Sequence, residues 1–142
     1  LGHLAAIHQG TGRSGVAAET YLQALRIHRE VGDRRFEGIA LGNLADLLRE
    51  SGDLDEAERR FEEALPILVE CGDRSAQASL YCNSARLLMD RGRFAEALRS
   101  WQQGASLFDE LRDTQNLGRH VAAIRLACAR AGVPAFDGPP SH

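Results

Sequence analysis

The sequence predicts an all-α solenoid of about seven helices arranged as antiparallel pairs, and three observations indicate it. Stretches of the chain match at a shift of 40 residues without insertion or deletion, as Leu1-Gly2-His3-Leu4-Ala5 and Leu41-Gly42-Asn43-Leu44-Ala45 show. Apolar residues within each unit recur at helical spacing, and strand-like alternation is missing from the sequence. Glycines recur between the helices, at Gly12, Gly52 and Gly92 and at Gly32 and Gly72.

The expected helices span residues 1–10, 14–31, 34–51, 54–71, 74–91, 94–111 and 115–131. Gly32, Gly52, Gly72 and Gly92 are expected in left-handed C-terminal caps, since glycine adopts that conformation without steric cost. The residues that follow three of these glycines are expected N-caps, and one of them forms a capping-box pattern with a glutamate: Asp33, Asp53 with Glu56, and Asp73. Pro66 predicts a bend one turn upstream, near Glu62.

The repeat divides the chain into a solenoid over residues 1–131 and a flexible tail over 132–142. The solenoid is expected to contain units 1–33, 34–73 and 74–113 and a capping helix, 115–131. Arg125 stands where the repeat has Ala45 and Ala85, which marks the last helix as the cap. Because the chain begins at Leu1 without a methionine, we expect it to be a piece of a longer protein.

Composition excludes several classes of function. The net charge of −3 argues against nucleic-acid binding, which requires a basic surface. No apolar run approaches the ~20 residues of a membrane span. Three cysteines without CxxC spacing, Cys71, Cys82 and Cys128, indicate neither disulfides nor zinc and favour the cytoplasm. All 17 basic residues are arginine, which we interpret as the codon bias of a GC-rich genome.

No motif indicates an enzyme or a cofactor. Gly10-Thr11-Gly12-Arg13-Ser14-Gly15 has the GxGxxG spacing of a dinucleotide site, but such a site must follow a buried strand. Here a helix precedes it, so we interpret Gly12 as the turn glycine of the repeat. HExxH and GxSxG are missing from the sequence, and the five histidines form no ligand cluster. We expect no catalytic, cofactor or metal residues.

The repeated residues resemble the tetratricopeptide repeat, whose pattern combines W-x2-L-G-x2-Y with A-x3-F. The first part reads Leu41-x2-Leu44-Ala45-x2-Leu48, and the second part reads Ala57-x3-Phe61 and Ala97-x3-Trp101. The resemblance implies a right-handed solenoid. The family's closing proline is missing, and with the 40-residue period this resembles the long-helix subgroup found in tails of large bacterial signalling proteins.

The resemblance also implies a concave groove that holds a peptide or helix of a partner. It assigns eight residues of this chain to the groove: Asn43, Asn83, Asp46, Arg49, Arg86, Met89, Arg119 and Arg130. Asn43 and Asn83 occupy equivalent positions, and an amide can both donate to and accept from a peptide backbone. The open alternative is that both amides bond only to neighbouring helix backbone.

The sequence therefore predicts a non-enzymatic scaffold for protein–protein interaction, in a cytoplasmic bacterial signalling protein, with a protein or peptide as partner and no nucleic acid or membrane. The alternative function is self-association. A homodimer would form through the first unit, where Leu1, Leu4 and Ala5 are expected to be uncovered.

Overall fold

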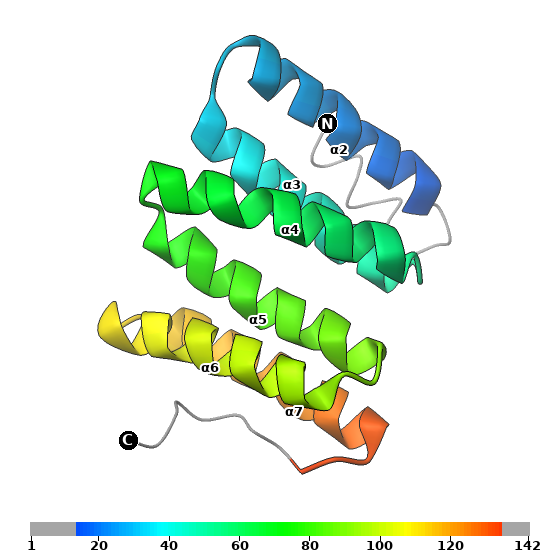
Figure 1. Ribbon diagram of the computed structural model, residues 1–142, viewed down its shortest axis with the longest axis vertical. Coiled ribbons are helices and arrows are strands. Elements are labelled where there is room, and N and C mark those ends of the chain that lie inside the picture. The colour runs from blue at the N-terminus through cyan, green and yellow to red at the C-terminus, as the bar shows by residue number, and fades with distance from the viewer. Residues whose placement is uncertain (1–13, 135–142) are drawn as a thin grey trace. The chain divides into compact units, whose positions relative to one another are not determined.

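The computed structural model describes residues 14–134, with side chains described from Glu19 onward, and this part of the chain is helical without strands (Figure 1). Its helices are α2 (Ser14–Glu30), α3 (Arg34–Glu50), α4 (Leu54–Cys71), α5 (Arg74–Asp90), α6 (Phe94–Glu110) and α7 (Thr114–Ala131). Each end lies within one residue of its predicted position. The predicted helix 1–10 lies outside the described residues.

The turn glycines adopt the predicted left-handed conformation. Gly32, Gly52, Gly72 and Gly92 have φ angles of 74°, 88°, 70° and 73°. Arg112 takes the matching position in the next repeat, and its φ of 56° shows that the turn keeps its conformation without a glycine. The shape of the turn is therefore a property of the helix pair, and glycine removes its steric cost.

The three expected N-cap residues differ in the bonds that their side chains make. The Asp33 carboxylate accepts a hydrogen bond from the Phe36 backbone N–H, as predicted. The Asp53 side chain makes no such bond, so the predicted capping box is wrong. For Asp73, the structure shows a carboxylate that binds the Arg35 guanidinium at 2.8 Å, and its capping role stays a prediction.

The glutamate of the expected capping box pairs along its own helix instead. Glu56 binds Arg59 at 2.5 Å and Arg60 at 3.0 Å, and the hydrogen bond from Arg59 lowers the pKa of the Glu56 carboxyl. A guanidinium one turn away therefore outcompetes the backbone N–H that a capping box would use. Pro66 lies inside α4, which continues to Cys71, and the bend near Glu62 stays a prediction.

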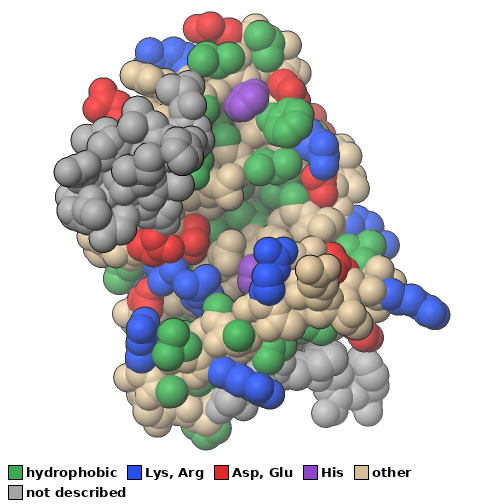
Figure 2. All heavy atoms as spheres, turned by 180° about the vertical axis from the view of Figure 1, so that it is seen from behind, with side chains coloured by type: hydrophobic (Ala, Val, Ile, Leu, Met, Phe, Trp, Pro, Cys, Tyr) green, Lys and Arg blue, Asp and Glu red, His purple; other side chains and the backbone are tan. Residues whose placement is uncertain are grey.

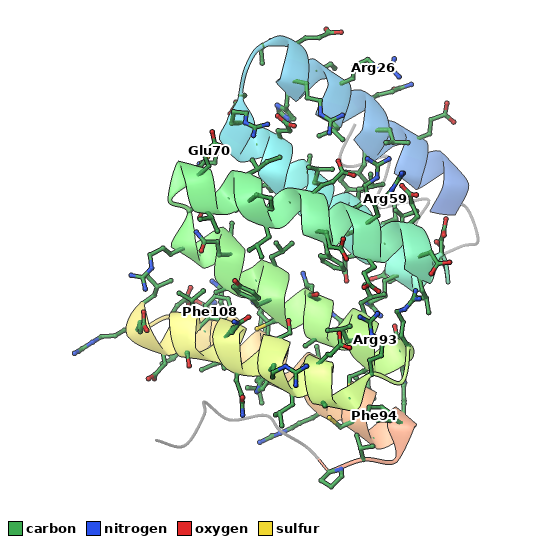
Figure 3. All side chains as sticks on the ribbon, viewed as in Figure 1. Arg26, Arg59, Glu70, Arg93, Phe94 and Phe108 are labelled. Carbon is green, nitrogen blue, oxygen red and sulfur yellow. The ribbon has the colours of Figure 1, made fainter. Side chains whose placement is uncertain are left out.

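The chain forms two compact units, residues 1–73 and 74–142. In the N-terminal unit α3 and α4 pack side by side, and α2 packs on α3. Arg34 at the start of α3 binds Glu70 at the end of α4 at 3.2 Å, which shows that the two helices are antiparallel (Figure 3). Their buried residues include Leu41, Leu44, Ala45, Ala57, Phe61, Ala64 and Leu68.

The C-terminal unit repeats this arrangement. Helices α5 and α6 are antiparallel, Arg74 binds Glu110 in the same way that Arg34 binds Glu70, and α7 packs on both. Phe108 points into the unit (Figure 3). The core comprises Ala78, Cys82, Ala85, Leu88, Met89, Ala97, Trp101, Ala105, Phe108, Ile124 and Cys128. The predicted all-α fold of antiparallel helix pairs is confirmed, and a continuous solenoid over 1–131 stays a prediction.

Candidate functional site

The two asparagines lie at equivalent positions of their helices, Asn43 on α3 and Asn83 on α5. Asn43 is exposed and Asn83 is half-buried. The structural alternative requires each side-chain amide to bond to the backbone of a neighbouring helix. Within residues 14–134, neither amide makes such a bond. Both amides are therefore available to a ligand in the described part of the chain, each with a donor and an acceptor.

Two other predicted site residues bind each other. The Arg49 guanidinium lies 3.1 Å from the Asp46 carboxylate and 3.8 Å from the carboxylate of Glu50. The side chain of Arg49 is only 11% exposed, whereas that of Asp46 is 24% exposed and that of Glu50 is 40% exposed. Of these three side chains, the two carboxylates are therefore more exposed than the guanidinium.

In the C-terminal unit the predicted residues fall into two groups. Arg86 is half-buried on α5, and Arg119 and Arg130 are exposed on α7, where Arg119 donates to the side-chain oxygen of Asn116. Met89 lies in the core and is only 4% exposed, so its assignment to the groove is wrong. The sequence did not reveal this because a methionine suits both a core and a binding surface.

The C-terminal unit also contains a pocket of about 600 Å³ that the sequence did not predict. Its walls come from α5 and α6, and they are mainly amides and hydroxyls: Gln77, Tyr81, Arg99, Gln102, Gln103, Ser106, Leu107 and Glu110. The sequence feature that could have indicated this pocket is Tyr81, which stands where the preceding repeat has the buried Leu41.

The matching surface of the N-terminal unit is in contact with α2. Glu37 and Glu63 stand 40 residues before Gln77 and Gln103, and both bind Arg29 of α2, at 3.0 and 3.7 Å. A helix therefore packs on this surface in the N-terminal unit. In the C-terminal unit the equivalent surface lines the pocket.

Comparison with known families agrees with the repeat. A sequence model described as tetratricopeptide repeat matches residues 1–68, and a second with the same description matches residues 78–103. The chain is a tetratricopeptide repeat protein. Neither a curated protein nor a solved structure matches it.

Tetratricopeptide repeats generally mediate protein–protein interactions and are generally non-catalytic. Cys82 is 1% exposed, and burial raises the pKa of its thiol to about 12, so the nucleophilic thiolate is suppressed at neutral pH. Cys82 is thus a small core residue.

No helix among residues 14–134 has the length and hydrophobicity that crossing a bilayer would require.

One exposed residue on the Asn43 side of α3 was missed by the sequence analysis. Phe36 is 46% exposed, stands seven residues before Asn43, and therefore lies on the same side of the helix. The seven-residue spacing was the available signal. A phenylalanine at the start of a helix is more often a core residue, and only the structure shows that this ring remains at the surface.

Proposed function

We propose that this repeat protein captures a peptide segment of a protein partner, with Asn43 and Asn83 bonding the peptide backbone. The observation that carries the proposal is that two amides at equivalent repeat positions lack hydrogen bonds to neighbouring helix backbone within residues 14–134. An amide matches the N–H and C=O groups of an extended chain whatever its side chains are. The proposal concerns the α3 surface and the α5 surface separately, and the concave groove stays a prediction.

The charged residues on the same helices would add selectivity. Asp46 and Arg49 on α3, and Arg86 on α5, were predicted from the sequence and remain at least partly accessible. On α7, Arg119 and Arg130 are exposed and favour a ligand with acidic groups. We further propose that the chain serves as a scaffold within a larger bacterial signalling protein in the cytoplasm, on the strength of the 40-residue period and the arginine-only basic composition.

The test is the loss of both amides. Peptides are first selected from a displayed library of random 16-residue sequences on the intact chain, and their binding is then measured to the variant Asn43→Ala with Asn83→Ala. We expect the double variant to lose binding while its circular dichroism stays unchanged, because neither side chain supports the core.

The matched control removes two exposed amides that lie elsewhere, with Gln23→Ala on α2 and Gln115→Ala on α7. This control should bind the selected peptides as the original chain does. Undiminished binding by the asparagine variant would refute the backbone-clamp role, and selection of no peptide at all would refute peptide capture.

Self-association is a second candidate, and exposed apolar side chains on α2 favour it. Leu22 and Ile27 on α2 are 38% and 50% exposed, and Val31, which directly follows the helix, is 70% exposed. Such residues can join copies of a chain. Sedimentation at several concentrations separates the two functions, because a module that only binds peptides stays monomeric, and Ile27→Asp would weaken a dimer formed through α2.

A further inference from the structure

Each helix pair of the chain is held together by one face of its first helix. In the pair α5/α6 that face includes Ala78 and Cys82, because a methyl group on Gly104 of α6 would lie 2.8 Å from the Ala78 oxygen and 2.6 Å from Cys82 Sγ. In the pair α3/α4 it includes Gly38, on which a methyl group would lie 2.8 Å from Leu68 of α4. Both pairs therefore make their close contact at the same repeat position, 38 and 78.

Helix α7 carries the same face, and there it is exposed. Gly118 and Ala122 stand 40 residues after Ala78 and Cys82. Both are exposed, whereas Ala78 and Cys82 are at most 1% exposed. Helix α7 packs on α5 and α6 through another side, where Ile124 is fully buried. In the described part of the chain, the side of α7 that corresponds to the pairing faces of α3 and α5 thus remains at the surface.

A glycine on this exposed face is unfavourable for the helix alone. Glycine in a helix interior is less stable than alanine because it loses more backbone freedom on folding. At the same repeat position of α3, Gly38 allows the close approach of α4. At Gly118 nothing lies within 4 Å of an added methyl group. A helix that approached α7 as closely as α4 approaches α3 would give Gly118 the same purpose.

The exposed side of α7 also carries a large apolar residue. Leu126 is 53% exposed, and it stands where the two preceding repeats have charged residues, Asp46 and Arg86. Eight residues separate it from Gly118 and four from Ala122, so the three lie along one side of the helix. Helix α7 lies behind α6 in Figure 1, and the surface seen from behind shows hydrophobic and arginine side chains next to one another (Figure 2).

The charged residues of α7 are all basic. The helix Thr114–Ala131 contains three arginines and neither aspartate nor glutamate. Arg119 and Arg130 are exposed, and Arg119 donates to the neutral side-chain oxygen of Asn116. The nearest carboxylate in the sequence, Asp113, precedes the helix and accepts hydrogen bonds from Asn116. Helix α7 therefore favours a ligand that supplies carboxylates.

We name these exposed residues the pairing face of α7: Gly118, Ala122 and Leu126, with Arg119 and Arg130 at its edge. We propose that the pairing face of α7 binds an acidic amphipathic α-helix of a partner protein. The helix packs antiparallel to α7, as α4 packs on α3 and α6 on α5, and places small residues against Gly118 and Ala122. This surface differs from the two asparagine surfaces, so the inference goes beyond the proposed peptide capture.

Arg125 limits the extent of the close contact. It stands where α3 and α5 have the fully buried Ala45 and Ala85, and it is exposed. An arginine is too long for the close approach that alanine allows. The closest contact is therefore assigned to the first half of α7, at Gly118 and Ala122.

A partner protein suits this face better than a second copy of the chain. Helices α4 and α6 carry the pattern that pairs with such a face, but the residues of that pattern are already buried within their own pairs: Ala57, Phe61, Ala64, Ala97 and Trp101. Two α7 helices would place arginine against arginine without a carboxylate in either helix. A helix from another protein meets neither obstacle.

The experiment uses a synthetic peptide with the sequence of residues 54–71, because α4 is the helix that covers this face on α3. The peptide carries Pro66→Ala to favour helix and Cys71→Ser to prevent disulfides. Its six carboxylates against two arginines give it a side-chain charge of −4. Fluorescence anisotropy with the intact chain should show saturable binding that weakens as salt rises. Circular dichroism should show a gain of helix on mixing, because an isolated peptide of this length is only marginally helical.

The first variant fills the space that the bound helix needs. Gly118→Leu should weaken binding of the peptide about tenfold or more, while the chain stays folded because nothing lies close to the new side chain. Gln23→Leu adds the same side chain at an exposed position of α2 and should bind as the original chain does.

The second variant removes the charges at the edge of the face. Arg119→Gln with Arg130→Gln should weaken binding about tenfold at low salt and reduce its salt dependence. The matched control makes the same change at two exposed arginines of the N-terminal unit, with Arg26→Gln and Arg59→Gln (Figure 3). This control should leave binding unchanged.

The outcomes separate this inference from the proposed function. Binding that Gly118→Leu leaves unchanged overturns the inference, since the peptide then occupies another surface, and so does the lack of binding at about 1 mM peptide. Loss of binding in Asn43→Ala with Asn83→Ala also overturns it, because the peptide would then lie on the asparagine surfaces as the proposed function requires. Sedimentation of the chain alone tests the second copy: a dimer that Gly118→Leu abolishes would assign the face to self-association and overturn the inference.

Discussion

The helix pairs α3/α4 and α5/α6 achieve the same close approach with a glycine on opposite helices. In the first pair the buried glycine is Gly38 on α3, and in the second pair it is Gly104 on α6. Their counterparts 40 residues away are Ala78 and Ala64, and both of these alanines are fully buried. The repeat thus requires small residues on both helices, but it does not determine which helix carries the glycine.

The surroundings of the two glycines differ more than their burial. A methyl group on Gly38 would lie 2.8 Å from Leu68 Cδ2 and 3.0 Å from Ile67 Cγ2, which are the ends of side chains. A methyl group on Gly104 would lie 2.6 Å from Cys82 Sγ and 2.8 Å from the backbone oxygen of Ala78. A side-chain end can move, whereas the backbone of a packed helix moves only with the helix. The two pairs should therefore tolerate an added methyl group very differently.

The largest change in stability is expected at another position where the two pairs differ. Helix α4 has Pro66 where α6 has Ser106. Proline in a helix interior costs about 3 kcal/mol because it removes a hydrogen bond and crowds the preceding turn. Pro66 is exposed, so its replacement loses no core contact. We expect Pro66→Ser to raise the free energy of unfolding by about 2 kcal/mol in urea titration.

The reciprocal change, Ser106→Pro, should lower the free energy of unfolding by a similar amount. If Pro66→Ser leaves stability unchanged, α4 already accommodates the ring, and the two pairs do not differ in this respect.

A smaller loss is expected for Gly104→Ala. The added methyl group overpacks the contact with α5, which costs about 1–3 kcal/mol and exceeds the gain of about 1 kcal/mol in helix propensity. Denaturant titration should therefore show a net destabilisation. Gly118→Ala on α7 is the matched control, because nothing lies within 4 Å of its added methyl group, and it should be stabilising.

The smallest effect is expected for Gly38→Ala. The ends of Leu68 and Ile67 can shift by a few tenths of an ångström, and the gain in helix propensity offsets the remaining strain. The change in unfolding free energy should stay within about 1 kcal/mol of zero. A loss as large as that of Gly104→Ala would show that α4 is as rigid as α5 at this contact.

Most of the fold could be predicted from the sequence because its signals are local. A helix end depends on the few residues around it, and every described helix end lies within one residue of its predicted position. The cap at α7 was missed: Asp113 accepts hydrogen bonds from the backbone and the side chain of Asn116. The Gly-Asp pair that marked the other expected N-caps is missing here, because Arg112 precedes Asp113.

The candidate site was predictable only in part. Asn43 and Asn83 follow from the repeat register, since equivalent positions of a repeat face equivalent surroundings. Met89 was misassigned because the same side of a helix can turn toward the core near its end, where α6 and α7 cover it. The exposed ring of Phe36 was not predictable, because its place at the surface depends on the position of α2.

The sequence by itself determined the repeat, the helices, their turns and the equivalence of Asn43 with Asn83. These features depend on residues close in the chain or on the 40-residue period. The tertiary structure decided which polar groups pair and which apolar groups are buried, as with Glu56 bound to Arg59 and Met89 in the core. The physical reason is that burial and ion pairing depend on side chains brought together by packing, which no local pattern specifies.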